Sequence, residues 1–208
     1  MTESALVTVL EASRAKGFLG PGPSEDHIEH ASGFARAALA AQPRSPTRAL
    51  DLGSGGGVPG LVLASLWWPA TVWVLLEASL RRCEFLADVL PALGLHHRVE
   101  VRQGRAEDLG RSPDLRGACD LVVARSFGPP GVVAECAAPF LALGGLAVVS
   151  EPPGGRSPRW VPAGLSLLGL RYETARSQLF SFALLRAEIP CPGQFPRRNG
   201  VPAKRPLF

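Results

Sequence analysis

The 208-residue sequence predicts a doubly wound α/β domain with a mostly parallel, seven-stranded sheet and one reversed strand at its edge. Three observations support this prediction. From Arg48 onward, short apolar segments alternate with amphipathic segments, as in β-α units on a parallel sheet. A glycine-rich segment follows the first apolar segment, as in nucleotide-binding folds of this type. Two longer apolar segments near the end are joined by a short connection, which indicates an antiparallel pair.

Two helices are expected before the first strand. Within residues 1–20, apolar side chains recur at helical spacing, and two glycines end the segment. The sequence GPGPS at 20–24 then interrupts the helical pattern. Ser24 is expected to cap a second helix, which ends before the segment 42–47.

The rest of the domain is expected to alternate strands and helices. The five parallel strands are predicted at 48–52, 71–76, 98–102, 119–124 and 145–150. The helices between them are predicted at 58–66, 79–93 and 130–142. The antiparallel pair is predicted at 165–174 and 178–187. The chain thus divides into a helical extension at 1–47, an α/β domain at 48–190 and a basic, proline-rich tail at 191–208.

The net charge of +4 is concentrated at the end of the chain. Residues 1–193 hold 18 basic and 18 acidic side chains, and four more cations lie between Gln194 and Phe208 without an acid. A neutral body with a basic end fits an enzyme with one polyanion-binding appendage better than a protein coated for nucleic acid. A solvated terminus is the alternative explanation of the same charges.

The cysteines and the apolar segments indicate the compartment. The four cysteines lie far apart, without a partner at metal-ligand spacing, so the sequence predicts neither a metal site nor a disulfide framework. No apolar segment approaches the roughly 18 residues of a membrane span. Glu3 and Glu11 stand where a signal peptide would carry basic residues. We therefore expect a soluble, cytoplasmic protein that has no membrane partner and acts as a monomer.

The segment ALDLGSGGGVPG at 49–60 fits two cofactor patterns. Its glycines match the dinucleotide pattern G-x-G-x-x-G, and Asp51 with alternate glycines matches D-x-G-x-G-x-G, the pattern of enzymes that use S-adenosylmethionine. Charge separates the two, because Asp51 would repel a pyrophosphate but attract the ammonium and sulfonium groups of S-adenosylmethionine. We therefore expect S-adenosylmethionine on this segment, with contacts from Asp51, Gly53, Ser54, Gly55 and Gly57.

Acidic residues follow the next two strands. Glu77 ends the second strand, 24 positions after Gly53, close to the offset at which an acid accepts hydrogen bonds from a ribose diol. NAD and S-adenosylmethionine both carry this diol, so Glu77 predicts a nucleoside cofactor without choosing between them. Glu107 and Asp108 lie at the tip of the third strand, where methyltransferases bind the adenine.

The sequence resembles a known family in order over residues 48–150. The resemblance rests on DLGSGGGVPG, LLEASLRRCEFL, GRAEDL, DLVVARSFGP and GGLAVV, and the tail FPRRNGVPAKRPL at 195–207 adds an independent match. These segments are similar to those of the bacterial small-subunit (16S) ribosomal RNA guanine-N7 methyltransferases, also called glucose-inhibited division protein B. The resemblance implies a class I S-adenosylmethionine-dependent methyltransferase fold and methyl transfer to N7 of a guanine in 16S ribosomal RNA.

The same resemblance implies the positions of the site residues. It places the cofactor on Gly53, Val58, Ala106, Glu107 and Arg125. Arg125 directly follows the fourth strand, at the edge where open sheets bind ligands, and can pair with the methionine carboxylate or the RNA backbone during catalysis. An ion pair of Arg125 with Asp51 or Glu107 is the structural alternative.

The expected chemistry needs alignment more than proton transfer. N7 of guanine carries an exposed lone pair, so its methylation needs no base. Arg-Ser-Phe-Gly follows the fourth strand in place of the Asn/Asp-Pro-Pro-aromatic motif that holds an exocyclic amine. Phe127 is a candidate either for stacking on the base or for the core. Contacts with ribosomal RNA or the small subunit are expected from His30, Arg81, Arg82, Arg197, Arg198, Lys204 and Arg205, with prolines holding the tail extended.

Three features depart from the family pattern. The amino-terminal region is short, Ser150 and Glu151 replace a Lys-Gly pair, and the crossover 151–164 is rich in proline and glycine. These departures leave two further hypotheses. One is a divergent paralogue that methylates another RNA or a small molecule, and the other is a protein that binds S-adenosylmethionine without turnover.

Overall fold

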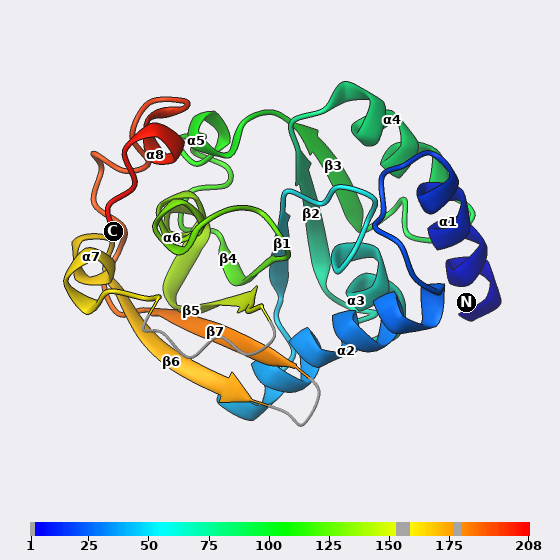
Figure 1. Cartoon of the computed structure of the whole chain (residues 1–208), viewed down its shortest axis with the longest axis horizontal. Helices are drawn as coiled ribbons and strands as arrows, with labels where there is room; N and C mark the ends of the chain where they lie inside the picture. Colours follow the sequence, from blue (N-terminus) through cyan, green and yellow to red (C-terminus); the bar gives the residue numbers. More distant parts are fainter. Residues whose placement is uncertain (1–2, 153–158, 177–179) are drawn as a thin grey trace.

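A computed structural model describes residues 3–152, 159–176 and 180–208, and its seven strands form one sheet between two layers of helices (Figure 1). The strand order is β3-β2-β1-β4-β5-β7-β6. β1 to β5 run parallel to one another, and β7 lies antiparallel between β5 and β6. The predicted doubly wound sheet is confirmed, with the reversed strand second from the edge.

The strands begin and end close to their predicted positions. They are β1 (Arg48–Leu52), β2 (Val72–Glu77), β3 (Val99–Gln103), β4 (Cys119–Ala124), β5 (Leu141–Ser150), β6 (Leu170–Arg176) and β7 (Ser181–Ala187). β5 starts earlier than expected because Leu141 already pairs with Cys119, before a register shift brings Leu146 beside Leu121. The connection expected before residue 178 falls largely on 177–179, outside the described residues.

The helices differ from the expected ones mainly at their ends. They are α1 (Glu3–Ala15), α2 (Ser24–Ala41), α3 (Gly60–Leu66), α4 (Leu80–Val89), α5 (Ala106–Leu109), α6 (Pro130–Ala137), the 3-10 helix η1 (Ala138–Phe140), α7 (Pro162–Leu167) and α8 (Val201–Lys204). Ser24 makes no capping bond, because it is already helical and Pro23 is the N-cap. The strand expected from residue 165 was wrong at its start, since Pro162 begins α7 there.

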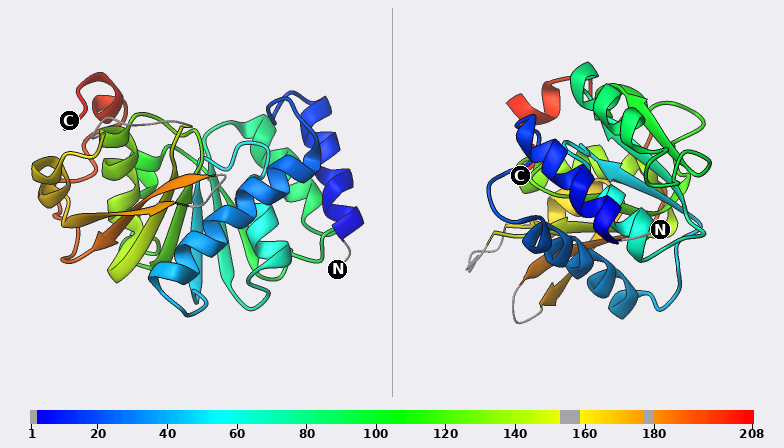
Figure 2. Two further views of the ribbon diagram at one scale, coloured as in Figure 1. Left: turned by 60° about the horizontal axis from the view of Figure 1, so that its bottom comes forward. Right: turned by 90° about the vertical axis from the view of Figure 1, so that its right-hand side faces the viewer.

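The sheet separates two apolar cores. Alternate residues of a strand point to opposite faces, which explains why the central strands are apolar throughout. Leu75 and Val123 belong to the core under α1 to α4, and Val74 and Val122 belong to the core under α6 and α7. The left view of Figure 2 shows α2 running across the first of these faces. Among the helices of the described ranges, none has the length and apolar character needed to cross a membrane.

The prediction that the tail forms an extended arm was wrong. Residues 201–204 form α8, and Phe195 and Pro202 are buried. Figure 1 shows α8 beside α5 and α6, on the opposite side of the molecule from α1. The prolines of the tail therefore belong to a segment that packs against the domain, not to an extended chain in solvent.

Candidate active site

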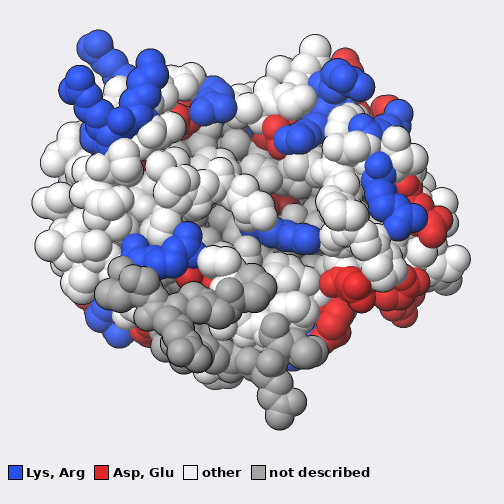
Figure 3. Space-filling view, in the orientation of Figure 1, with Lys and Arg blue, Asp and Glu red and all other residues white. Residues whose placement is uncertain are grey.

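Three adjoining cavities lie beyond the carboxyl ends of the central strands, where open α/β sheets bind ligands. We name them the Glu77 cavity, the glycine-loop cavity and the His30 cavity, with volumes of about 320, 360 and 340 Å³. Ser126 lines all three cavities. Its φ of 54° is left-handed, which is uncommon for a residue with a side chain and turns the chain sharply after β4. The hollow is visible near the centre of the face in Figure 3.

The glycine-loop cavity is built on the turn after β1. Ser54, Gly55, Gly56 and Val58 line it together with Phe18 and Leu19 of the α1–α2 connection. Gly53 adopts a φ of 74°, and a Cβ there would come within 2.7 Å of Phe127. Only glycine therefore lets Phe127 lie against this turn. The predicted loop residues Gly53, Ser54, Gly55 and Val58 do meet in the wall of this cavity.

Asp51 and Gly57 lie behind this wall instead of in it. Asp51 is 1% exposed and accepts a hydrogen bond from the Gly60 N–H at 2.9 Å. Burial raises the pKa of Asp51 to about 7. A Cβ on Gly57 would strike Leu61 at 2.4 Å. The expected direct contact of both residues with a cofactor is therefore not supported by their positions; both instead fix the start of α3.

Glu77 joins two loops at the Glu77 cavity. Its carboxylate is buried and accepts hydrogen bonds from the N–H groups of Gly55 and Ser79, both at 2.9 Å. Arg82 Nη1 lies 3.8 Å from the same carboxylate and lines this cavity and the glycine-loop cavity. The carboxylate thus holds the glycine loop against the start of α4 while it faces the cavity.

Ala106 and Glu107 form the opposite wall of the Glu77 cavity. They are the first residues of α5 and both are buried. Glu107 Oε1 accepts a hydrogen bond from the backbone N–H of Gly200 at 3.0 Å. The sequence analysis expected both residues at the cofactor, and it missed the contact of Glu107 with the tail.

Arg125 stands between the glycine-loop cavity and the His30 cavity. Its Nη2 donates to His27 Nδ1 at 3.0 Å, and His27 Nε2 donates to the Gly20 carbonyl oxygen at 3.2 Å. This chain of bonds requires neutral His27, and burial together with Arg125 lowers the pKa of His27 below its ordinary 6.5. In the described parts of the chain, Arg125 forms no ion pair with Asp51 or Glu107. Its Nη1 is buried and has no hydrogen-bond partner there.

His27 is a site residue that the sequence did not reveal. It lies on α2 with no motif around it, and only its distance to Arg125 gives it a role. His30, which the sequence predicted as an RNA contact, lines the His30 cavity, and burial lowers its pKa to about 4. Glu151 lines the same cavity and accepts hydrogen bonds from Trp160 Nε1 at 2.7 Å and Arg159 Nη1 at 3.0 Å.

All but one of the cations predicted to bind RNA belong to two surface groups. Figure 3 shows one blue cluster over α5 and α8 and another over α4 and α1, on either side of the hollow. Exposed Arg198, Lys204 and Arg205 belong to the tail, and exposed Arg81 belongs to α4 with half-buried Arg82. The exception is Arg197, whose guanidinium forms an ion pair with the fully buried Glu135 at 2.6 Å. This ion pair occupies its charged group, so the structure gives no support to its assignment to RNA.

This fold and site define a class I methyltransferase. The O-methyltransferase TomG from Streptomyces achromogenes in complex with SAM superposes with a TM-score of 0.59 at 21% identity, over 90% of this chain and 91% of that chain. An O-methyltransferase from Bacillus cereus in complex with SAH gives a TM-score of 0.60 at 17% identity, over 90% and 92%. At these identities the likeness concerns the fold.

The sequence comparisons give the family. A family model described as rRNA small subunit methyltransferase G matches residues 34–150. The ribosomal RNA small subunit methyltransferase G of Symbiobacterium thermophilum is 36% identical over 197 residues, which cover 89% of this chain and 80% of that protein. The protein of the same name from Moorella thermoacetica is 33% identical over 168 residues, covering 77% and 69%. The chain belongs to the rRNA small subunit methyltransferase G family, and it is an S-adenosylmethionine-dependent enzyme that methylates small-subunit ribosomal RNA.

Proposed function

We propose that the three cavities bind the two reactants of methyl transfer to N7 of a guanine in small-subunit ribosomal RNA. The Glu77 cavity takes the nucleoside half of S-adenosylmethionine and the glycine-loop cavity its methionine half. The His30 cavity takes the target base. The observation that carries this proposal is that all three cavities meet at Ser126. We further propose that the enzyme acts as a monomer in the cytoplasm, a compartment in which its four free cysteines remain reduced.

The cavity walls fit the polar groups of this cofactor. Glu77 offers acceptors to the ribose diol, and Glu107 offers them to the adenine amino group. The unpartnered Nη1 of Arg125 is a buried donor, and a carboxylate such as that of methionine satisfies it. When bound, the cofactor supplies an electrophilic methyl group.

The protein's own contribution is alignment and electrostatics. Arg125, which is held by His27, fixes the methionine end of the bound cofactor. Phe127 lies between the Glu77 and His30 cavities, where the target base can stack on it. No proton has to leave N7. The titratable groups of the His30 cavity agree with this, because His30 has a pKa of about 4 and Glu151 is already held by Arg159 and Trp160.

Purified enzyme should transfer a methyl group from S-adenosylmethionine to small subunits, giving 7-methylguanine in mass spectra of the digested RNA. A substrate with 7-deazaguanine at the modified position should accept none. Methylation of a small-molecule panel in preference to RNA would favour the paralogue hypothesis, and binding without any transfer would favour the non-catalytic one.

A pH effect on cofactor binding should arise at His27. Because the pKa of His27 is lowered, the folded protein binds a proton on His27 less readily than the unfolded chain does. Acidification below pH 6.5 therefore opposes the hydrogen bond between Arg125 and His27. Protonated His27 cannot accept from Arg125, so affinity for S-adenosylhomocysteine should fall as the pH drops from 7 to 5. His27→Gln, which keeps an acceptor but does not titrate, should reduce this fall when measured by calorimetry.

The matched control for this prediction is His96→Gln, which changes an exposed histidine. It should reproduce the wild-type pH profile. Asp51 also titrates near neutrality, so it contributes to the change of affinity with pH in every variant. The effect of His27 is therefore the difference between the pH profile of His27→Gln and that of the wild type. An unchanged profile in His27→Gln would assign the acid effect to Asp51 alone.

The exposed tail cations should bind RNA phosphates. Replacing Arg198, Lys204 and Arg205 with alanine should lower RNA affinity and reduce the slope of log K against log salt by roughly 2–3 units, at about 0.7–0.9 per phosphate contact. Filter binding at several salt concentrations measures the slope. Unchanged affinity would show that these side chains are only solvated and would leave the RNA surface to Arg81 and Arg82.

A further inference from the structure

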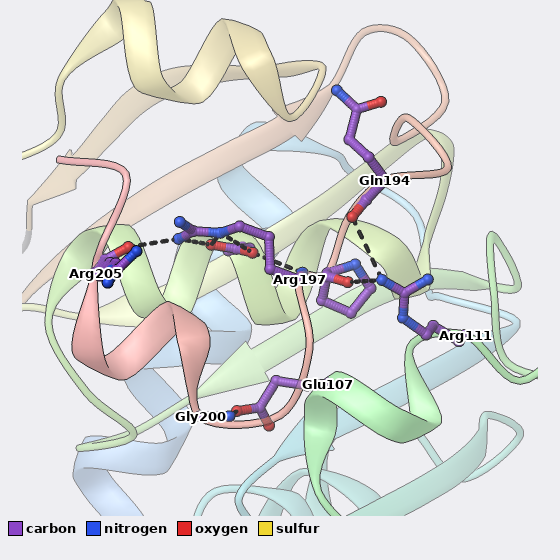
Figure 4. Close-up of polar contacts among 8 residues, drawn as sticks. Glu107, Arg111, Gln194, Arg197, Gly200 and Arg205 are labelled. Carbon is purple, nitrogen blue, oxygen red and sulfur yellow. Dashed lines mark hydrogen bonds and ion pairs between the residues drawn. The ribbon is translucent and has the colours of Figure 1, made fainter.

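Residues 195–208, which we call the C-terminal segment, pack against the body of the domain beside α5 and α6 (Figure 4). Arg116 of the body donates to the carbonyl oxygens of Cys191 and Phe195, both at 2.8 Å. Arg111 donates to the carbonyl oxygen of Pro196. Two arginines thus fix the chain where it enters the segment.

Arg197 then anchors the segment to α6. Its Nη2 lies 2.6 Å from Glu135 Oε2 and its Nε lies 2.8 Å from Oε1, and its backbone N–H donates to the same carboxylate. Glu135 is fully buried, so its charge depends on this partner. Figure 4 shows the guanidinium of Arg197 between this carboxylate and the backbone of Arg205.

Beyond this anchor the segment reaches the cavity wall. The backbone N–H of Gly200 donates to Glu107 Oε1 at 3.0 Å, and the side-chain amide of Asn199 donates to Asp108 at 3.2 Å. Ala203 lines the Glu77 cavity. Within the described residues, the Glu107 carboxylate accepts its only hydrogen bond from Gly200, and exposed Arg105 lies 3.7 Å from the same oxygen as a weaker ion-pair partner. The Glu107 side chain is 4% exposed.

We propose that the C-terminal segment is a positioning element of the cofactor site, and that Gly200 orients Glu107 to accept a hydrogen bond from the 6-amino group of adenine. The inference rests on the proposed placement of the nucleoside half of the cofactor in the Glu77 cavity. A carboxylate accepts but does not donate, so an oriented Glu107 favours a base with an amino group over one with a carbonyl group at this position. The segment thereby sets the base selectivity of the cofactor site.

The test compares the binding of S-adenosylhomocysteine with that of S-inosylhomocysteine, in which a carbonyl replaces the amino group. The wild-type protein should prefer the adenosyl compound by about tenfold or more in calorimetry. Deleting residues 199–208 removes Gly200 but keeps the pair of Arg197 with Glu135. The preference should fall close to one, a change that loss of stability alone would not produce.

A pair of glycine substitutions repeats the test in the full-length chain. Gly200 has a φ of 77° and open space around its Cβ position, so Gly200→Ala shifts the turn without a clash and should lower the preference. Gly193→Ala is the matched control, because the space there is equally open and its φ is not left-handed. Glu107→Ala should abolish the preference for the adenosyl compound. Combined with the deletion, it should cause no further change in that preference.

The possible results are distinguishable. If the wild-type protein binds neither compound, the proposed placement of the cofactor in these cavities is wrong. If the wild-type protein binds both equally, or if the deletion variant and Gly200→Ala both keep the full preference, the proposal for the C-terminal segment is wrong. If the deletion variant does not fold, Gly200→Ala decides alone.

Discussion

Arg125→Ala should cause the largest loss of activity, lowering kcat/KM on small ribosomal subunits by roughly 100-fold. Arg125 faces two cavities, and its Nη1 has no acceptor among the described residues, so its removal takes a charge-assisted bond from the bound cofactor. Such a bond contributes about 1.5–3 kcal/mol, which corresponds to a loss of about 10- to 100-fold in affinity for S-adenosylhomocysteine. Calorimetry and single-turnover methylation measure the two effects.

Arg125→Lys separates charge from geometry in this experiment. Lysine keeps the cation but cannot satisfy His27 and a carboxylate together through one planar group, so it should recover only part of the affinity. The melting temperature of both variants should stay near that of the wild type, because Arg125 is only partly buried. Full activity in Arg125→Ala would show that the residue is a structural partner of His27 and nothing more.

Arg197→Ala should have the largest effect on stability, lowering the free energy of unfolding by about 3 kcal/mol. The change leaves the carboxylate of Glu135, which is 0% exposed, without its partner. Urea denaturation followed by circular dichroism measures the loss. Replacing both residues with leucine should restore much of it, because neither charge is then buried alone.

The neighbouring cation gives the matched control. Arg198 is exposed, and Arg198→Ala should leave stability within about 0.5 kcal/mol of the wild type. If the two alanine variants had equal stability, the ion pair with Glu135 would not anchor the C-terminal segment. RNA affinity should show the opposite order, with the greater loss in Arg198→Ala.

The parts of the fold and site that the sequence predicted are those with a local cause. β1 and the glycine loop are continuous in sequence, and their apolar and glycine patterns follow from burial on both faces and from the left-handed turn at Gly53. Glu77 was found because it ends β2, and Glu107 because it lies on the short turn of helix that follows β3. Their place in the Glu77 cavity then follows from the parallel order of β1, β2 and β3.

The parts that the sequence did not reveal depend on partners far apart in the chain. His27 meets Arg125 across 98 positions, and Arg197 meets Glu135 across 62. A buried glutamate on a short helix carries no sign of its partner in sequence, so all four cations of the basic tail were assigned to RNA, Arg197 included. For the same reason, Asp51 was assigned by its charge, whereas its burial behind the loop depends on the packing of Gly60 against it.

The position of Arg125 between two cavities has a thermodynamic consequence. One guanidinium faces both the glycine-loop cavity and the His30 cavity, so a ligand in one cavity changes the charge felt by a ligand in the other. If the proposed occupants are right, a methionine carboxylate that neutralises Arg125 in the glycine-loop cavity changes the field at the RNA base in the His30 cavity. By linkage, RNA must alter the affinity for the cofactor by the same factor. We therefore expect the affinities for cofactor and RNA, measured together, to depend on each other through Arg125.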